Sequence, residues 1–508
     1  MILSIVISAG LAYFLSLPFA SVLQGGRYRL SALLRAKKQS LACLLYFVLS
    51  AAACLGVRSC LSGVPTKIAT FFLYVTTGLF VFLTYEKMRI GMHFTHRLVR
   101  LLVFCIFLYV ALFIGLFFLS LNCFWAVTPA LSPFVLALSA LILGPIEKRN
   151  NDRYIRRVKS VLQSLSATKI AVTGSYGKTS VKSYLELLLS AKYATLASPE
   201  NYNTPLGVAK TMEQATGREE MLVLEMGARR KGDILELCEM VRPDIGVITG
   251  IAPQHLETFG SIENVLAEKS VLGKSVAEQN PVFYNLTDPL VRSLYERRQG
   301  KKIGVGYEDA DYLISDVRFF AQGSSFALSK GDKTERITMP CVGAACVVNF
   351  SLAAAVALDL GVSWEDIVLA AKRAYPPAHR FDVVKSGDVT VIDDSYNVNP
   401  VGASVALDSL KLFEGKRKIV YTSGMVELGK EEENLNFALG EKIANIASVA
   451  IVAEGRYGDA VARGIKAKGN VALYRVPDTK AASALFSTIL KKGDVLLIMS
   501  DLPRDYLL

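Results

Sequence analysis

Residues Ile170–Ser180 read I-A-V-T-G-S-Y-G-K-T-S, which is the composition of a phosphate-binding loop. A β-branched strand would run into the glycines, and a helix would open at the lysine. Glycines let backbone N–H groups turn toward an anion, and the helix N-terminus and the lysine add positive charge. The pattern therefore predicts ATP, with Mg²⁺ on the threonine hydroxyl. The predicted contacts are Gly174, Ser175, Gly177, Lys178, Thr179 and Ser180, although Val172 replaces one glycine of the general motif.

Three later residues could serve the same phosphates. Glu225 ends the predicted strand M-L-V-L-E-M, where a carboxylate can hold Mg²⁺ directly or through water. His255 lies in the loop I-A-P-Q-H-L-E, and its imidazole could ligate a second metal or orient a phosphate. The plain alternative for His255 is a hydrogen-bonded loop histidine. Lys269, on the next predicted helix, has by itself the pattern of a solvated lysine.

Two polar segments are candidates for contacts with other substrates. Ser198–Gly207 reads S-P-E-N-Y-N-T-P-L-G, and its asparagines could bind substrate or simply form a turn. Val391–Pro400 reads V-I-D-D-S-Y-N-V-N-P at a predicted strand end, which is more polarity than a structural turn needs. Arg380 precedes it beside Pro376-Pro377, a predicted hinge, so its guanidinium could reach ATP when two domains close.

The first 146 residues differ in composition from the rest of the chain, because apolar residues dominate them. We predict about five membrane helices, each near the ~20 residues that a bilayer requires. They are Ile2–Leu23, Leu41–Leu61, Ile68–Thr84, Leu101–Leu121 and Phe124–Leu143. Basic residues gather after the first, third and fifth runs, so the rule that positive loops stay inside places everything after residue 146 in the cytoplasm. The sequence thus predicts a multi-pass protein of the cytoplasmic membrane, in contact with the lipid bilayer.

After Thr168, short β-branched strands alternate with helical patterns, which predicts two α/β units. We predict membrane helices plus α/β: a transmembrane bundle (1–146), a basic juxtamembrane linker (147–165), a central P-loop ATPase domain (166–377) and a C-terminal Rossmann-like domain (378–508). Tyr312–Met339 reads instead as antiparallel hairpins. The net charge of +12 is partly juxtamembrane, and the absence of a basic stripe with interleaved aromatics argues against nucleic acid. We predict that the eight cysteines are reduced thiols that contribute only to packing.

From about residue 165 onward the chain resembles the Mur ligase family of ATP-dependent amide-bond ligases. The motifs that carry the resemblance occur in order: T-G-S-Y-G-K-T-S, L-E-M-G-A, I-A-P-Q-H-L-E, V-V-N-F-S-L, D-D-S-Y-N-V-N-P and G-M-V-E-L-G. The last two are similar to the branch that adds D-alanyl-D-alanine to a UDP-MurNAc-tripeptide. The resemblance implies peptidoglycan precursor synthesis, with a carboxylate activated as an acyl phosphate and then attacked by an amino acid or dipeptide.

The resemblance also implies roles for single residues. Asn349 and Arg380 would contact ATP, and Asp394 would lie near its ribose and γ-phosphate. Thr179 and Glu225 would hold Mg²⁺, His255 would help bind a second Mg²⁺, and Lys269 would be a metal-bridging carbamate. Lys178, His255 and Lys269 would then be the catalytic group. Substrate contacts would come from Asn201, Asn203, Thr204, Tyr396 and Asn397.

The departures from the family concern the other substrates. The family's domain that grips UDP-MurNAc is replaced by the apolar runs, the N-x-N-N loop ends in Thr204, and a K-G-S-R element is absent from residues 499–506. Alternatives therefore stay open: a ligase acting on a lipid-linked precursor, a ligase for another envelope polymer such as poly-γ-glutamate, or a nucleotide-sensing membrane subunit without turnover. The sequence does not identify the acceptor, the amine, the oligomeric state or membrane partners.

Overall fold

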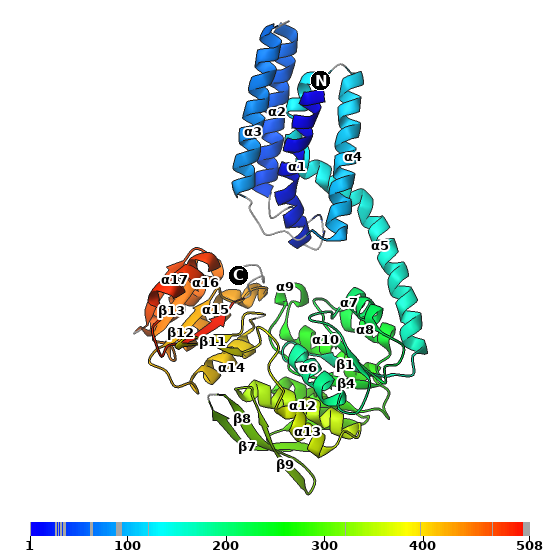
Figure 1. Ribbon diagram of the computed structural model, residues 1–508, viewed down its shortest axis with the longest axis vertical. Helices are drawn as coiled ribbons and strands as arrows, with labels where there is room; N and C mark the ends of the chain where they lie inside the picture. Colours follow the sequence, from blue (N-terminus) through cyan, green and yellow to red (C-terminus); the bar gives the residue numbers. More distant parts are fainter. Residues whose placement is uncertain are drawn as a thin grey trace. The chain divides into compact units, whose positions relative to one another are not determined.

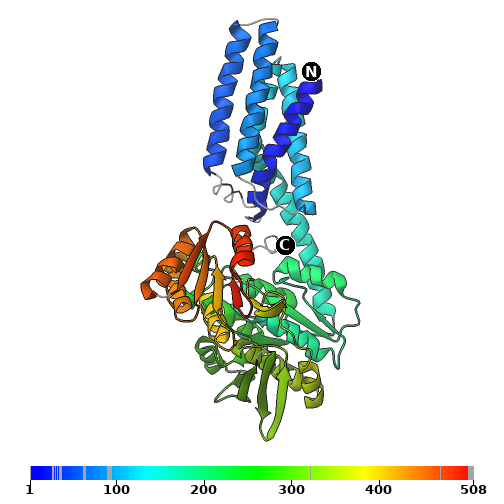
Figure 2. The same cartoon turned by 60° about the vertical axis from the view of Figure 1, so that its left-hand side comes forward.

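The computed structural model describes residues 2–25, 28, 30, 33, 37–60, 64–87, 94–119, 121–320, 322–396, 398–469 and 471–500. They divide into two compact units, residues 1–153 and 154–508. Figures 1 and 2 show helices alone in the first unit and mixed α/β layers in the second. The predicted domain boundaries and the membrane itself remain predictions.

The first unit contains five long helices. Four lie wholly within it, and two short 3₁₀ turns precede the fifth, which crosses the division between the units. Their bounds are α1 Ile2–Gly25, α2 Lys37–Cys60, α3 Val64–Lys87, α4 His96–Phe118, η2 Asn122–Ala126, η3 Thr128–Leu131 and α5 Ser132–Ser164. In the described part of the chain, five helices are long and apolar enough to cross a membrane.

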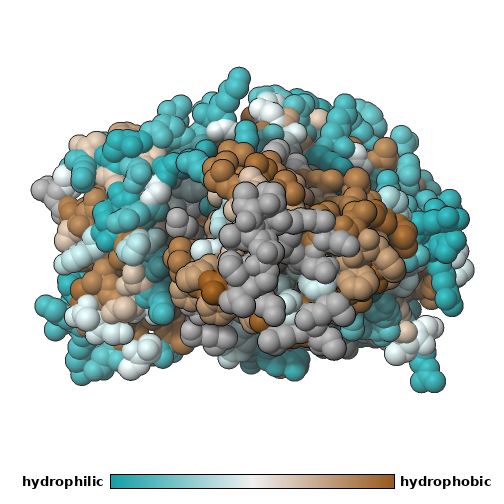
Figure 3. All heavy atoms as spheres, turned by 90° about the horizontal axis from the view of Figure 1, so that it is seen from above, coloured by the Kyte–Doolittle hydropathy of each residue, from teal (hydrophilic) through white to brown (hydrophobic). Residues whose placement is uncertain are grey.

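Apolar side chains are exposed on these helices, among them Phe71 (64 %), Phe107 (63 %) and Leu49 (63 %). Figure 3 shows hydrophobic residues gathered in one region of the face that it draws. Several polar groups between the helices are paired, as in the bond between Tyr109 Oη and Ser132 Oγ at 2.9 Å, whereas the buried Trp125 Nε1 has no partner among the described residues. Exposed apolar surfaces with mostly paired internal polar groups suit a bilayer.

Helix α5 differs from the prediction at both ends. It begins at Ser132 rather than at Phe124, because Pro129 lies in the preceding 3₁₀ turn and Pro133 occupies the first helical turn, where proline fits. It then continues through Pro145 to Ser164, so residues 147–164 of the predicted linker are helical. No glycine or second proline follows Pro145 to end the helix earlier.

The second unit contains a nine-stranded sheet in the order β2-β3-β1-β4-β5-β6-β7-β8-β9. Strands β2 to β7 pair in parallel, and β7, β8 and β9 pair antiparallel, as Tyr312–Met339 predicted. The strands are β1 Thr168–Thr173, β2 Thr195–Ala197, β3 Met221–Met226, β4 Ile245–Ile248, β5 Val282–Asn285, β6 Lys302–Gly306, β7 Tyr312–Phe320, β8 Gly323–Lys330 and β9 Lys333–Met339.

Helices cover both faces of this sheet, because alternate residues of the central strands enter different cores. Ile170 and Val172 pack in one hydrophobic cluster, and Ala171 packs in the other. The helices and turns are α6 Lys178–Leu189, α7 Pro205–Thr211, η4 Met212–Gln214, α8 Asp233–Val241, α9 Leu256–Phe259, α10 Ile262–Ser275, α11 Pro289–Arg297, α12 Ala344–Asp359 and α13 Trp364–Ala371.

A six-stranded sheet follows, in the order β10-β11-β15-β12-β13-β14, parallel except for its edge strand β10. Its elements are β10 Asp382–Ser386, β11 Val389–Asp393, α14 Pro400–Leu410, β12 Lys418–Thr422, η5 Gly429–Glu431, α15 Glu432–Ala444, β13 Val449–Ala453, α16 Arg456–Lys468, β14 Ala472–Val476, α17 Thr479–Ile489 and β15 Val495–Met499. Parallel strands with helices on both faces are the predicted Rossmann-like arrangement.

Cysteine pairing is the second difference from the sequence prediction. Cys341 and Cys346 form a disulfide with their Cα atoms 6.2 Å apart, where packing thiols were expected. The chain turns at Gly343 (φ 108°) just before α12, and this turn brings the two residues together. Cys43, Cys105 and Cys238 are buried thiols, as expected.

Candidate functional site

The glycine-rich loop lies between β1 and α6, as the sequence predicts. Gly177 has φ 81°, and a Cβ atom on it would lie 2.7 Å from Asn349 Oδ1. A Cβ atom on Gly174 would lie 2.1 Å from Thr249 Oγ1. Both positions therefore need glycine. The close approach also places Asn349, on α12, beside the loop where the resemblance expects it to contact ATP.

Lys178 is folded back over this loop. Its Nζ donates to the carbonyl oxygens of Gly174 at 2.8 Å and Ser175 at 3.3 Å. Burial, opposed by Glu225 and reinforced by Arg380, lowers the pKa of Lys178 to about 8. An ammonium held against carbonyls with little water is poised to exchange them for phosphate oxygens.

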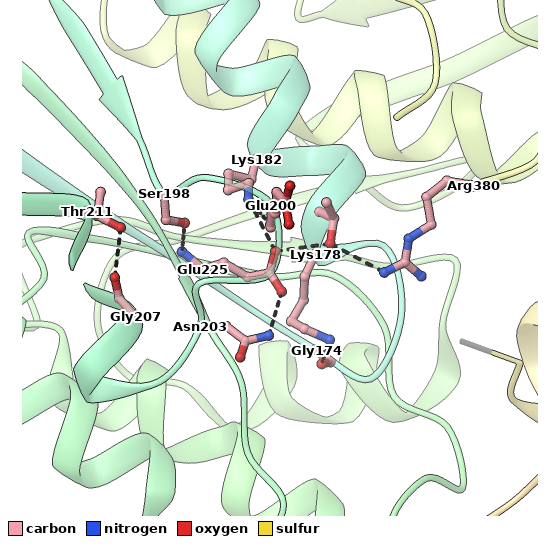
Figure 4. Close-up of polar contacts among 11 residues, drawn as sticks. Gly174, Lys178, Lys182, Ser198, Glu200, Asn203, Gly207, Thr211, Glu225 and Arg380 are labelled. Atoms are coloured by element: carbon pink, nitrogen blue, oxygen red, sulfur yellow. Dashed lines mark hydrogen bonds and ion pairs between the residues drawn. The ribbon is translucent and has the colours of Figure 1, made fainter. Parts of the chain in front are cut away.

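Glu225, at the end of β3, is the centre of a polar network (Figure 4). Its Oε2 accepts a hydrogen bond from Thr179 Oγ1 at 3.0 Å, and its Oε1 accepts one from Asn203 Nδ2 at 3.0 Å. Its backbone amide donates to Ser198 Oγ at 3.1 Å. Burial alone would raise the pKa of Glu225, but Lys178, Lys182 and these hydrogen bonds hold it below its usual value. The carboxylate is thus ionised.

The oxygens of Thr179 and Glu225 fit Mg²⁺. The ion prefers hard oxygen ligands and takes few from the protein, keeping waters and phosphate oxygens for its remaining positions. The described residues include no group of three or more His, Cys, Asp or Glu side chains that could hold a metal. A site with one carboxylate and one hydroxyl therefore requires the phosphates to complete it.

Lys182 belongs to this network, although the sequence analysis missed it. Its Nζ lies 3.6 Å from Glu225 Oε2 and donates to the carbonyl of Glu200 at 2.5 Å. Only 5 % of its side chain is exposed. The signal was present, since Lys182 follows Lys178 by four residues and such positions share a helix face.

His255 lies in a loop before a helix, as predicted, and forms a contact with the last part of the chain. It precedes α9 with φ 54°, and its Nδ1 contacts Glu427 Oε2 closely. Glu427 Oε1 also accepts from Arg229 at 3.4 Å, and its carbonyl accepts from the Glu257 amide at 3.4 Å. Burial lowers the pKa of His255, and Glu427 offsets part of that shift. Binding of a second metal by His255 stays a prediction.

Lys269 is buried, with 3 % of its surface exposed, so its interpretation as a solvated lysine is wrong. The α10 face that carries it packs toward the sheet, a tertiary effect that local sequence does not show. Burial, and secondarily Lys178, lowers the pKa of Lys269 to about 7. A neutral amine is the form that can add to CO₂, so this environment favours the predicted carbamate, which itself stays a prediction.

The last part of the chain brings two charged groups to the loop. Arg380 donates to Thr179 Oγ1 at 3.5 Å, and its guanidinium stacks 4.1 Å from the ring centre of Tyr396. Asp394 Oδ1 accepts from the Phe381 amide at 3.1 Å. Burial raises the pKa of Asp394 to about 6 against the opposing effect of Arg380. These residues reach the same loop from the far side of the predicted hinge.

The predicted substrate residues are only partly gathered. Asn203 contacts Glu225, whereas Asn201 is exposed and contributes its carbonyl to the Asn203 amide at 2.8 Å. Thr204 caps α7 by accepting from the Gly207 amide at 3.2 Å, which is a structural use of its hydroxyl. Asn397 and residues 501–508 lie outside the described residues.

Two family models match this chain. The Mur ligase middle domain matches residues 172–357, and the Mur ligase, glutamate ligase domain matches residues 379–502. The chain is 32 % identical over 356 residues to the UDP-N-acetylmuramoyl-tripeptide–D-alanyl-D-alanine ligase of Mycobacterium tuberculosis, covering 65 % of this chain and 70 % of that one. The enzyme of the same name from Mycobacterium leprae is 30 % identical over 375 residues, covering 68 % and 72 %.

A solved structure has the same fold. The MurF ligase of Thermotoga maritima in complex with ADP superimposes with a TM-score of 0.63 and 26 % identity, covering 69 % of this chain and 80 % of that one. Residues 1–171 lie outside both family matches.

Proposed function

This chain belongs to the Mur ligase family, and we propose that it is a MurF-type ligase. It would use ATP to join D-alanyl-D-alanine, or a similar small amine, to the peptide carboxylate of a peptidoglycan precursor. The observation that carries the proposal is the network of Lys178, Thr179, Glu225 and Arg380 in a chain whose relatives bear that enzyme's name.

The chemistry has two steps. An oxygen of the substrate carboxylate attacks the γ-phosphorus of ATP, the bond to the β-phosphate breaks, and ADP leaves behind an acyl phosphate. The amine then attacks the acyl carbon, loses a proton and expels inorganic phosphate, which leaves an amide. Both reactants of the first step are anionic, so the site must neutralise their repulsion.

The chain's own residues supply this neutralisation. Lys178, half-buried at the loop, would bind the β- and γ-phosphate oxygens, and Arg380 would bind them from the other side of the hinge. Mg²⁺ held by Thr179 and Glu225 would neutralise phosphate charge. Asn349 would contact the adenine. Asp394 would lie near the ribose and γ-phosphate, and closure of the two α/β parts would keep water from the acyl phosphate.

A second candidate function uses the same chemistry. It is a membrane-anchored ligase whose carboxylate substrate is linked to a lipid. The five apolar helices favour it, because they stand in the part of the chain outside the family matches. If they span the cytoplasmic membrane as the basic loops predict, the ligase unit would be cytoplasmic and would follow the bilayer directly along the chain. A nucleotide sensor without turnover fits less well, because every predicted phosphate-binding group is present.

Phosphate release from purified full-length protein tests both candidates. The MurF-type proposal expects release that requires both UDP-MurNAc-tripeptide and D-alanyl-D-alanine, and release with ATP alone or with either partner alone would contradict it. Lys178→Ala is the control for ATP hydrolysis by a contaminant. Supplying the tripeptide as its lipid-linked form in the same assay separates the candidates, because the lipid-linked hypothesis is wrong if the UDP-linked form reacts as fast.

A further inference from the structure

The buried charge of Lys182 has no role in the reaction described so far. It stands on α6 one turn after Lys178, inside the network around Glu225 (Figure 4). A lysine with only 5 % of its side chain exposed must satisfy its ammonium within the protein. It does so with two partners, Glu225 Oε2 at 3.6 Å and the Glu200 carbonyl at 2.5 Å.

These partners belong to different parts of the site. Glu225 Oε2 is the oxygen that also accepts from Thr179, so it faces the position proposed for Mg²⁺. Glu200 lies in the segment Ser198–Thr204, which carries the asparagines predicted to bind substrate, and its own backbone is held at φ 39°. Lys182 thus joins the Glu225 carboxylate, the proposed metal ligand, to the backbone of this loop at Glu200.

The same loop is attached to β3 and to Gly227, the residue after it, at four further points. The Ser198 amide donates to the Val223 carbonyl at 2.9 Å, and Ser198 Oγ accepts from the Glu225 amide at 3.1 Å. Asn203 Nδ2 donates to Glu225 Oε1 at 3.0 Å, and the Asn203 carbonyl accepts from the Gly227 amide at 2.8 Å. Two of the five attachments, those of Lys182 and Asn203, thus use the carboxylate oxygens that a metal would also contact. Loop position and metal occupancy therefore share the same atoms.

We infer that Lys182 is a positioning residue that couples the Mg²⁺ site to the substrate-binding loop Ser198–Thr204. Its ammonium competes with the metal for Glu225 and at the same time anchors the loop. When a metal takes Glu225 Oε2, Lys182 keeps its bond to Glu200 and holds the loop in place for the carboxylate substrate. This inference rests on the proposed ligase function for the identity of that substrate.

The inference predicts two opposite effects of Lys182→Met in the full-length protein. Removal of a positive charge beside Glu225 should tighten Mg²⁺ binding in the presence of ADP, lowering the half-saturating concentration on the order of tenfold. Loss of the bond to Glu200 should speed amide hydrogen exchange in residues 198–204, also on the order of tenfold. The KM for the carboxylate substrate should rise more than kcat falls.

A structural role alone would not produce this combination, because general loosening of the fold weakens metal binding. Lys182→Arg keeps both the charge and a donor, so it should restore loop protection. Lys192→Met is the matched control, since exposed Lys192 also donates to a backbone carbonyl, that of Gly361 at 2.7 Å. It should change neither quantity.

Weaker Mg²⁺ binding in Lys182→Met, or unchanged exchange in residues 198–204, would overturn the inference. If that variant does not fold, Lys182→Gln keeps a donor without the charge, and it should tighten Mg²⁺ binding while retaining loop protection. An unchanged Mg²⁺ requirement in Lys182→Gln then overturns the inference. The metal and exchange measurements need no acceptor, so a failure of the proposed ligase activity would show only in the kinetic measurement.

Discussion

Asp394→Asn should make the protein more stable at neutral pH and leave it unchanged in acid. Asp394 follows β11, where its side chain accepts from the Phe381 amide and burial raises its pKa to about 6. An asparagine has nearly the same shape, and its Oδ1 can accept the same hydrogen bond. The substitution therefore removes the ionisation with little change in packing.

The size of the effect follows from the two pKa values of Asp394. In the unfolded chain the group titrates near pH ~4, about two units below its folded value, and each unit corresponds to about 1.4 kcal/mol. The folded state binds the proton more tightly, so the free energy of unfolding falls as pH rises from about 4 to about 6 and stays lower above. Some solvent contact screens the charge, so the cost at pH 7 is about 2 to 3 kcal/mol.

Thermal unfolding of the full-length protein in detergent, measured across this pH range, tests the reasoning. The advantage of Asp394→Asn should be near zero at pH ~3, below both pKa values, and grow to roughly 5–10 °C in Tm at pH ~7.5. Asp408→Asn is a control of opposite sign, because Lys442 and Lys411 outweigh burial and hold the pKa of exposed Asp408 below its usual value. An advantage of Asp394→Asn that is equal at both pH values, or a loss of stability at pH ~7.5, would refute the reasoning.

Three further outcomes are expected. Lys178→Ala should abolish phosphate release while the circular dichroism spectrum stays unchanged, since it removes the charge that faces the phosphates. Phosphate release at the wild-type rate would show that Lys178 does not bind the ATP phosphates. Glu427→Gln and Arg229→Ala should each slow turnover. Because the two side chains share one ion pair, the double variant should lose less activity than the sum of the two single losses in free energy. Fully additive losses would contradict the pairing. Single cysteines at Leu30 or Thr95 should be shielded from an impermeant reagent in intact cells, whereas cysteines at Gly63 or Asn122 should label; the reverse pattern would invert the predicted topology.

The phosphate side of the site could be predicted from sequence because its geometry is local and repetitive. Strands β1 and β3 pair in parallel with Val172 opposite Glu225, so the loop after one strand and the acid that ends the other must meet at one edge of the sheet. The spacing of Gly174, Gly177 and Lys178 then determines which backbone groups face that edge. The parallel α/β architecture was predicted from the same alternation of strands and helices.

The residues that sequence reasoning misjudged depend on packing between segments far apart in the chain. Lys269 has the local pattern of a solvated helix lysine, and only the burial of its helix face distinguishes it. The contact between Glu427 and His255 joins residues separated by 172 positions. The helical course of residues 147–164 and the pairing of Cys341 with Cys346 were missed for a related reason, since no strong local signal marks either one.

Contacts across the predicted hinge join the two α/β parts. His379 and Phe381 flank Arg380 with φ 62° and 55°, a conformation that is costly for residues with side chains and persists only when the surroundings enforce it. In this conformation Arg380 reaches Thr179, and Glu427 reaches His255 and Arg229. We therefore expect these contacts to open and re-form during turnover, and opening of the hinge, rather than phosphoryl transfer, to limit the rate once all substrates are bound.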